Sequence, residues 1–255
     1  MQTQPGQKPF RENFSRLSRE RLERMRRGAD DVLEALEEIT SRRSHVVTEL
    51  IGAGPFVIGE HYPPDDVYDS GSGAGFYYHA HHDDPRAYPD GYQHLPEHGH
   101  FHLLMNRLAA PAGAQPLKRP GRPIKNWGQS HIVALVMGND GAPCRLFTLN
   151  QWLSQEWLYS APAVIDMLDR FVLTDPELQT PINRWVFGMA MLFQPQIAHL
   201  LQERDRILSS RPPAKGAKSI YQDQSLEIPS RIDIDLDRQI SAVDSAWRRG
   251  RVCTD

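Results

Sequence analysis

Hydrophobic positions along the chain change their spacing twice, and the changes divide it into parts. From about residue 14 to 42 apolar side chains recur at helical spacing, and from about 56 to 149 they alternate or run together as in strands. Helical spacing returns over 150–210, and a tail over 225–250 first alternates and then becomes helical. This pattern predicts a single α+β domain over 14–255, preceded by a disordered lead over 1–13.

The strand-like part contains one clear hairpin. Two apolar runs, 131–138 and 143–150, flank the turn sequence 139–142, in which Gly141 can take a positive φ. The first run is apolar on both faces, which indicates a central strand. An earlier run, 56–58, predicts a first strand, and the prolines at 63 and 64 are expected to end it, because proline cannot donate a ladder hydrogen bond.

The helical parts supply the expected cover for these strands. Gly28 predicts a break in the first helical segment, and Asn150 and Ser160 are expected helix caps. Pro195 indicates a kink or a fresh helix start, and alternation near 232–236 predicts an edge strand. We therefore expect an antiparallel β-sheet or partly closed barrel over 56–149, covered by N-terminal and C-terminal helices.

Composition excludes several classes of function. Of 255 residues, 40% are hydrophobic and 24% charged, as in ordinary globular proteins, and the formal net charge of −3 gives no electrostatic reason to expect nucleic acid or an anionic membrane as partner. No apolar run approaches the roughly 20 residues that span a bilayer. The N-terminus lacks the apolar core of a secretory signal, which favours the cytoplasm. Cys144 and Cys253 are far apart, so neither a disulfide framework nor a cysteine-type zinc site is expected.

Seven of the eleven histidines lie between residues 76 and 104, and five of them form two runs with alternate spacing. The first run contains His79 and His81, and the second contains His98, His100 and His102. Alternate side chains of a strand emerge on one face, roughly 6.5 Å apart. Two such strands, paired antiparallel, would aim several imidazoles at one small volume, which is the ligand set of a transition metal. The sequence therefore predicts a metal site.

Strand geometry limits which histidines share one ion. His98 and His102 would lie roughly 13 Å apart in a regular strand, so His98 joins the others only if Gly99 forms a bulge that re-aims it. Otherwise His98 would serve a second ion or support the ligands. His131, which opens the central strand, and His61 are further candidates for ligands or for their supports. Asp65, Asp66 and Asp69 are expected to be turn residues rather than ligands.

Three classes of function fit a site of imidazoles without thiolate. The first is a non-haem iron or copper oxidoreductase acting on a small substrate or on dioxygen. The second is a carrier of metal or haem. The third is a zinc-dependent hydrolase with Glu97 or Asp83 as general base. Glu97, Tyr78 and His98 are the candidate catalytic residues, and the oligomeric state stays open.

Three motifs carry a resemblance to a known family. HYPPDDVYD, YYHAH and EHGHFH, together spanning about the middle half of the chain, resemble an uncharacterised family of bacterial proteins, and this resemblance implies no activity. HxH on a strand is also similar to the metal-binding strands of cupins. The carboxylate and distal histidine that follow HxH in cupins are not matched here. The HExxH motif of zinc proteases and the common nucleotide-binding fingerprints are absent from the sequence.

Overall fold

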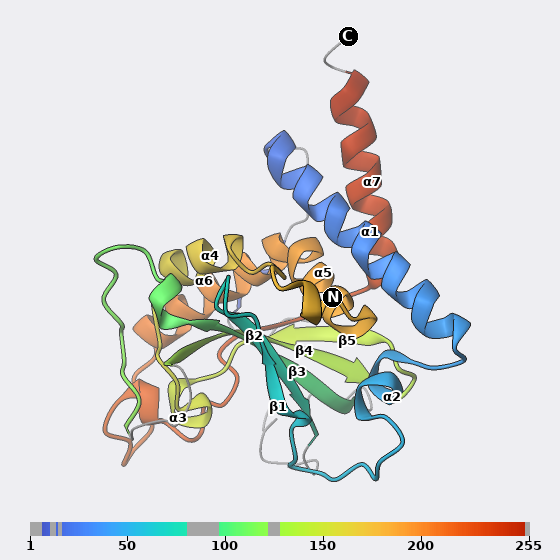
Figure 1. The fold of residues 1–255 in the computed structure, drawn as a ribbon. Coiled ribbons are helices and arrows are strands. Elements are labelled where there is room, and N and C mark those ends of the chain that lie inside the picture. The colour runs from blue at the N-terminus through green and yellow to red at the C-terminus, as the bar shows by residue number, and fades with distance from the viewer. Residues whose placement is uncertain (1–6, 11–13, 15–16, 81–96, 122–127, 253–255) are drawn as a thin grey trace.

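The structure, a computed structural model, describes residues 7–10, 14, 17–80, 97–121 and 128–252. Six antiparallel strands form one sheet, in which they follow chain order from one edge to the other (Figure 1). Within the described residues the two edge strands do not pair, so the sheet is open and is not a barrel. The strands are β1 (Tyr62–Tyr68), β2 (Ala74–His79), β3 (Glu97–Asn106), β4 (Gln129–Gly138), β5 (Pro143–Phe147) and β6 (Arg231–Asp233).

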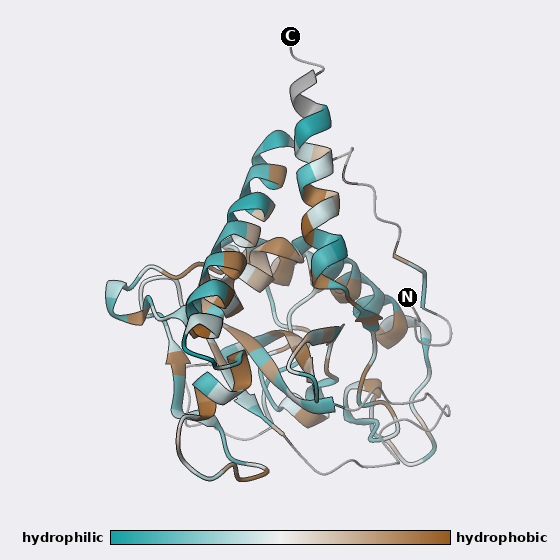
Figure 2. Cartoon of the chain, turned by 90° about the vertical axis from the view of Figure 1, so that its right-hand side faces the viewer, coloured by the Kyte–Doolittle hydropathy of each residue, from teal (hydrophilic) through white to brown (hydrophobic). Residues whose placement is uncertain are grey.

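Helices cover one face of this sheet, which confirms the expected α+β class (Figure 1). The described helices are α1 (Arg19–Ser41), α2 (Val46–Ile51), α3 (Gln151–Ser154), α4 (Ala161–Asp169), α5 (Pro181–Leu192), α6 (Gln194–Ser210) and α7 (Leu236–Val252). Short 3₁₀ turns lie at Arg107–Ala109, Pro176–Leu178 and Ile220–Gln222. Helices α1 and α7 rise from the body and converge (Figure 2). Both carry hydrophobic residues interspersed among hydrophilic ones. None of the described helices combines the length and apolar character needed to cross a bilayer.

Helix α1 is continuous, so the predicted break at Gly28 is wrong. Ser18 caps the helix by accepting a hydrogen bond from the Arg21 amide at 3.2 Å. A Cβ on Gly28 would lie 2.7 Å from the carbonyl oxygen of Gly188, and one on Gly188 would lie 2.9 Å from that of Gly28. The two glycines therefore serve packing, because they allow α1 and α5 to cross with their backbones in contact.

The first strand differs from its prediction. Residues 56–58 are not a strand and are exposed, whereas β1 contains both prolines that were expected to end regular structure. An edge strand tolerates proline, because one side of it forms no ladder. Tyr62 pairs with Tyr78 and Val67 with Phe76, so residues 63–66 of β1 lie opposite Tyr77 alone. This irregular stretch places Asp66, with a φ of 54°, beside the sheet face described below.

The predicted hairpin is confirmed as β4 and β5, with Gly141 at a φ of 80°. Strand β4 is buried along its whole length between β3 and β5, as its apolar character predicted. The tail forms the edge strand β6 and then α7, also as predicted. The helix capped by Asn150 is shorter than expected, because Gln155 takes a left-handed conformation with a φ of 55° and ends α3.

Part of the lead expected to be disordered contacts the body. The Gln7 side-chain oxygen accepts a hydrogen bond from the Arg231 amide at 3.0 Å. The Lys8 amide donates to the Glu203 carboxylate at 2.8 Å. Residues 1–6 and 11–13 lie outside the described residues. Residues 7–10 therefore lie against α6 and β6 rather than apart from the fold.

The two faces of the sheet have different chemistry. Alternate residues of β3, Phe101 and Leu103, belong to the large core shared with the helices. His100 and His102, which alternate with these residues along β3, emerge on the opposite face. That face also carries a smaller apolar cluster, made of Ala134, Val136, Phe147, Leu149 and Ile228. The sheet thus separates the main core from the histidines.

Candidate metal centre

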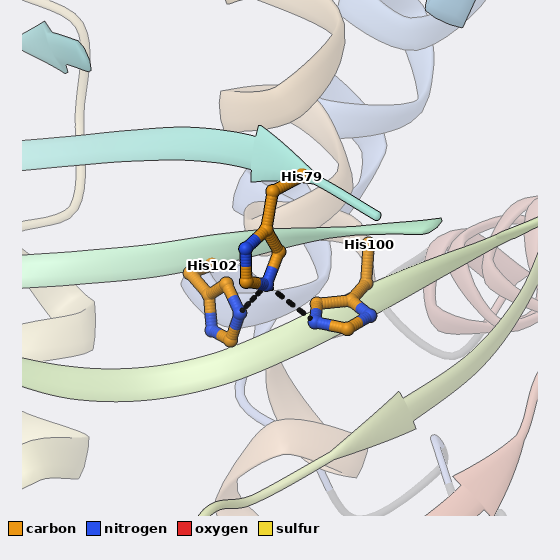
Figure 3. A group of neighbouring side chains, drawn as sticks. All are labelled: His79, His100 and His102. Atoms are coloured by element: carbon orange, nitrogen blue, oxygen red, sulfur yellow. Dashed lines mark hydrogen bonds between the residues drawn. The ribbon is translucent and has the colours of Figure 1, made fainter. Parts of the chain in front are cut away.

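Three histidines from β2 and β3 point into one volume (Figure 3). His79 lies directly opposite His100 in the antiparallel register, and His102 follows two residues later on the same face of β3. The Nε2 atom of His79 is 3.0 Å from Nε2 of His100 and 3.0 Å from Nε2 of His102. His100 and His102 are buried, and His79 is half-buried. Antiparallel pairing of His79 on β2 with the HxH run of β3 is the direct cause of this convergence.

The spacing of the nitrogens fits a single metal ion. One ligand nitrogen from each histidine can be chosen so that all lie within 4.8 Å of one another. At a metal–nitrogen distance of about 2.1 Å, neighbouring ligands lie about 3.0 Å apart in an octahedral site and about 3.4 Å apart in a tetrahedral one. The observed 3.0 Å separations match this range. The buried histidine group could therefore hold a metal ion.

A fourth histidine supports the group from β4. His131 Nε2 lies 2.9 Å from His102 Nδ1, and both rings are buried. Leu103 pairs with Val133 and Leu104 with His131, so Ile132 is an extra residue in β4. This bulge turns His131 toward the histidine face. Burial, reinforced by the nearby Arg204 charge, lowers the pKa of His131 to about 3, so its ring is neutral.

Burial has the same effect on His102. Loss of hydration, together with the neighbouring histidines, holds the pKa of His102 well below its usual range. A neutral His102 carries a single ring proton. With Nδ1–H donating to His131, the Nε2 lone pair faces His79, which is the arrangement that a metal ligand requires.

An aromatic wall flanks the histidines on the β1 side. Tyr77 contacts the ring of His102 at a centroid distance of 4.8 Å and that of His79 at 5.5 Å. His61 stacks on Tyr77 with centroids 3.8 Å apart, and its Nδ1 lies 2.8 Å from Asp66 Oδ1. Asp66 thus orients an imidazole, whereas Asp69 acts as the predicted turn residue by accepting hydrogen bonds from the amides of residues 71 and 72.

A buried ion network lies on the β5 side. Arg145 is 1% exposed and forms ion pairs with Glu97 and with Asp233. Glu97 was a candidate general base, but the structure pairs its carboxylate with this guanidinium. Between the network and the histidines, Phe147 contacts the ring of His100 at a centroid distance of 5.3 Å.

His98 lies apart from the three converging rings. It is the extra residue of a bulge, because Glu97 pairs with Gly138 and Gly99 with Met137. The bulge that the sequence raised as a possibility is present, but it turns His98 toward Tyr78, whose hydroxyl lies 2.6 Å from His98 Nδ1. A Cβ on Gly99 would meet the carbonyl oxygen of His79 at 2.5 Å, so glycine allows this close approach. Tyr78 itself is buried in the main core.

Other predicted residues cannot be placed in the group or lie far from it. His81 and Asp83 fall within 81–96, outside the described residues, as do His82 and His94. His199, on α6, lies with its Nε2 atom 3.0 Å from the Lys8 carbonyl oxygen.

One residue of interest was missed by sequence reasoning. Glu156 is 7% exposed, and it lies in the part over 150–210 that was expected to be helical. Burial, reinforced by the negative charge of Asp66, raises its pKa to about 8. No periodicity marks such a position, because its burial depends on how the segment after α3 packs against β4.

Comparison with known proteins gives one match. A model of the family described as "Domain of unknown function (DUF6969)" matches residues 26–234. No curated protein and no solved structure matches the chain. The matched range runs from within α1 to the end of β6, so it includes the whole sheet and the three converging histidines, and it exceeds the middle half that the sequence motifs span.

Proposed function

The chain belongs to this uncharacterised family, and we propose that it is a metalloprotein in which His79, His100 and His102 bind one transition-metal ion. The observation that carries the proposal is the convergence of three imidazole nitrogens on one sheet face, with His79 Nε2 3.0 Å from each of the other two and all three within 4.8 Å of one another. Neutral His102, oriented by His131, supports it further. His81 stays a proposed fourth ligand on its sequence spacing.

We propose further that the protein is a non-haem iron or copper oxidoreductase acting on a small substrate or dioxygen. Imidazole suits both metals, and within the described residues the converging group contains neither carboxylate nor thiolate. Three ligands from the protein leave positions open, at which such a metal would supply redox chemistry or Lewis acidity. The chain contributes a buried floor of strands, and the Tyr77 wall excludes water on one side.

A zinc-dependent hydrolase is the second candidate, because a set of three histidine ligands also suits zinc. Three histidines with an open position also form the zinc site of carbonic anhydrase. Three uncharged ligands leave the ion's charge uncompensated, which lowers the pKa of a bound water. Among the general bases expected for this reaction, Glu97 is paired with Arg145.

Metal identity separates these candidates. Protein should be produced without a histidine tag in medium containing iron, copper and zinc, and analysed for elements and by ultraviolet–visible spectroscopy. We expect about one iron or copper per chain and an absorption change on reduction. Stoichiometric zinc without a redox response would favour the hydrolase, and a Soret band would identify a haem carrier. Metal content no higher than in a His79→Ala, His100→Ala variant would contradict a shared site.

A further inference from the structure

Glu156 is a buried residue whose carboxyl group has one oxygen without a hydrogen-bond partner in the described part of the chain. The residue is 7% exposed, and its Oε2 atom is buried with no hydrogen-bond partner among the described residues. The segment is held firmly, because the amide of the next residue, Trp157, donates to the Gln129 carbonyl oxygen of β4 at 3.0 Å. Buried polar groups in native proteins nearly always have partners, so the missing partner of Glu156 needs an explanation.

Electrostatic interactions and one backbone hydrogen bond place this carboxyl group on the same side of the molecule as the histidines, because Trp157 is bonded to Gln129, two residues before His131 on β4. Glu156 interacts with Asp66 of β1 and with Tyr77 of β2, and Tyr77 touches the rings of both His79 and His102. Arg107 and Arg119 lie over the ring of the neighbouring Trp157. The carboxyl group therefore lies on the Tyr77 side of the histidine group.

The state of Glu156 at neutral pH is set by this environment. Burial is the main cause that raises its pKa to about 8, with the Asp66 charge adding to it. The group is then a carboxylic acid, which can donate one O–H hydrogen bond. Its oxygens are not among the ligand atoms that converge within 4.8 Å, which argues against a role as metal ligand.

We propose that Glu156 donates a hydrogen bond to a small anion, or to a ligand that presents an oxygen, bound at the open side of the three-histidine centre. This inference rests on the proposed metal centre and assigns a ligand class to it. The metal would hold the negative end of such a ligand, and Glu156 would supply the donor that fixes its orientation. A carboxylic acid suits this role, because a carboxylate in the same place would repel an anion.

Azide binding to cobalt-loaded protein tests the inference. Cobalt(II) reports ligand exchange by its visible spectrum, and azide is a small anionic acceptor. Glu156→Leu should bind azide roughly 10- to 100-fold more weakly than wild type, which is the range for loss of a hydrogen bond to a charged group. Glu156→Gln keeps a donor and should retain most of the affinity. Glu37→Gln, at an exposed position of α1, is the matched control and should bind like wild type.

The pH dependence provides a readout that a structural role would not change. Azide affinity of the wild type should fall more steeply above about pH 8 than that of Glu156→Gln, because only the wild type loses its donor proton. Cobalt content should be equal in all variants. Equal azide affinity in Glu156→Leu and wild type would overturn the inference, and so would loss of cobalt from Glu156→Gln, which would make Glu156 a ligand. Failure of the wild type to bind cobalt would instead refute the metal centre itself.

Discussion

His102 Nδ1 lies 2.9 Å from His131 Nε2, and burial keeps both rings neutral. The two residues come from adjacent strands, β3 and β4, and meet only because the extra residue Ile132 shifts the register between them. His131 therefore orients His102 without belonging to the converging group, and it can accept the Nδ1–H hydrogen bond of a His102 that binds a metal through Nε2. Partners of this kind typically change metal affinity by about 10- to 100-fold when they are removed.

The first prediction concerns this partner. His131→Ala should weaken metal binding by about 10- to 100-fold without abolishing it, because the three converging nitrogens stay in place. His131→Gln, whose side-chain oxygen can accept from His102, should recover part of the loss. Competition with a chelator of known affinity measures both. Equal affinity of wild type and His131→Ala would show that the hydrogen bond does not matter for the metal.

The second prediction is a loss of stability in mild acid. A histidine whose pKa is lower in the folded state than its ordinary 6.5 binds a proton more readily when unfolded. His131 and His102 therefore stabilise the fold fully above pH 6.5, and this contribution is lost as pH falls from 6.5 toward their folded pKa values. Metal-free wild type should lose up to about 1.4 kcal/mol per pH unit for each such histidine.

Urea unfolding of metal-free protein between pH 7 and 4.5 measures this slope. His131→Gln should lose stability less steeply than wild type, since it lacks one of the two groups. Identical slopes would mean that His131 is not held neutral by the fold. With metal present, occupancy should also fall in acid, because only neutral imidazole binds a metal.

The third prediction tests the crossing of α1 and α5. Gly28→Ala should destabilise the protein by about 1–3 kcal/mol, because the added methyl group would meet the Gly188 backbone at 2.7 Å. Gly54→Ala is the matched control, as a Cβ there meets nothing within 4 Å and the backbone needs no positive φ. Urea unfolding of both variants compares them. Similar stabilities would contradict backbone contact between the helices.

The fourth prediction tests whether Glu97 has a structural role, as an ion-pair partner of Arg145, or a catalytic role as a general base. Glu97→Gln should reduce stability by about 1–3 kcal/mol, because it removes one of two carboxylates paired with the buried Arg145. Glu60→Gln, at an exposed position, should leave stability unchanged. Metal content should be the same in both. An unchanged unfolding midpoint in Glu97→Gln together with loss of turnover would instead restore Glu97 as a general base.

The sequence predicted those parts of the molecule that depend on local pattern. Alternation placed His79, His100 and His102 on strands, and the turn at 139–142 predicted the hairpin that makes β4 central. The choice between an open sheet and a barrel depended on whether the edge strands pair, and no local pattern encodes that. The prediction that Pro63 and Pro64 end a strand was wrong for the same reason. A strand can contain these prolines only if it is an edge strand, as β1 is.

The remaining errors and omissions come from tertiary contacts. A glycine within a helical pattern can mark either a helix break or a close crossing of two helices. The contact of Gly28 with the Gly188 backbone shows that it serves a crossing. A bulge at Gly99 was one of two alternatives that the sequence left open, and the direction in which it turns His98 depends on the contact with the Tyr78 hydroxyl. Glu156 carried no signal, because its burial arises from packing of an irregular segment on β4.

The most direct test of the shared metal site is the metal content of variants in which histidines are removed singly and together. His79→Ala, His100→Ala and His102→Ala should each lose most of the metal, and the His79→Ala, His100→Ala double variant should lose no more than either single one, because each change opens the same coordination sphere. His45→Ala and His199→Ala should keep wild-type content. Full metal content in the double variant, measured on folded protein, would contradict the site.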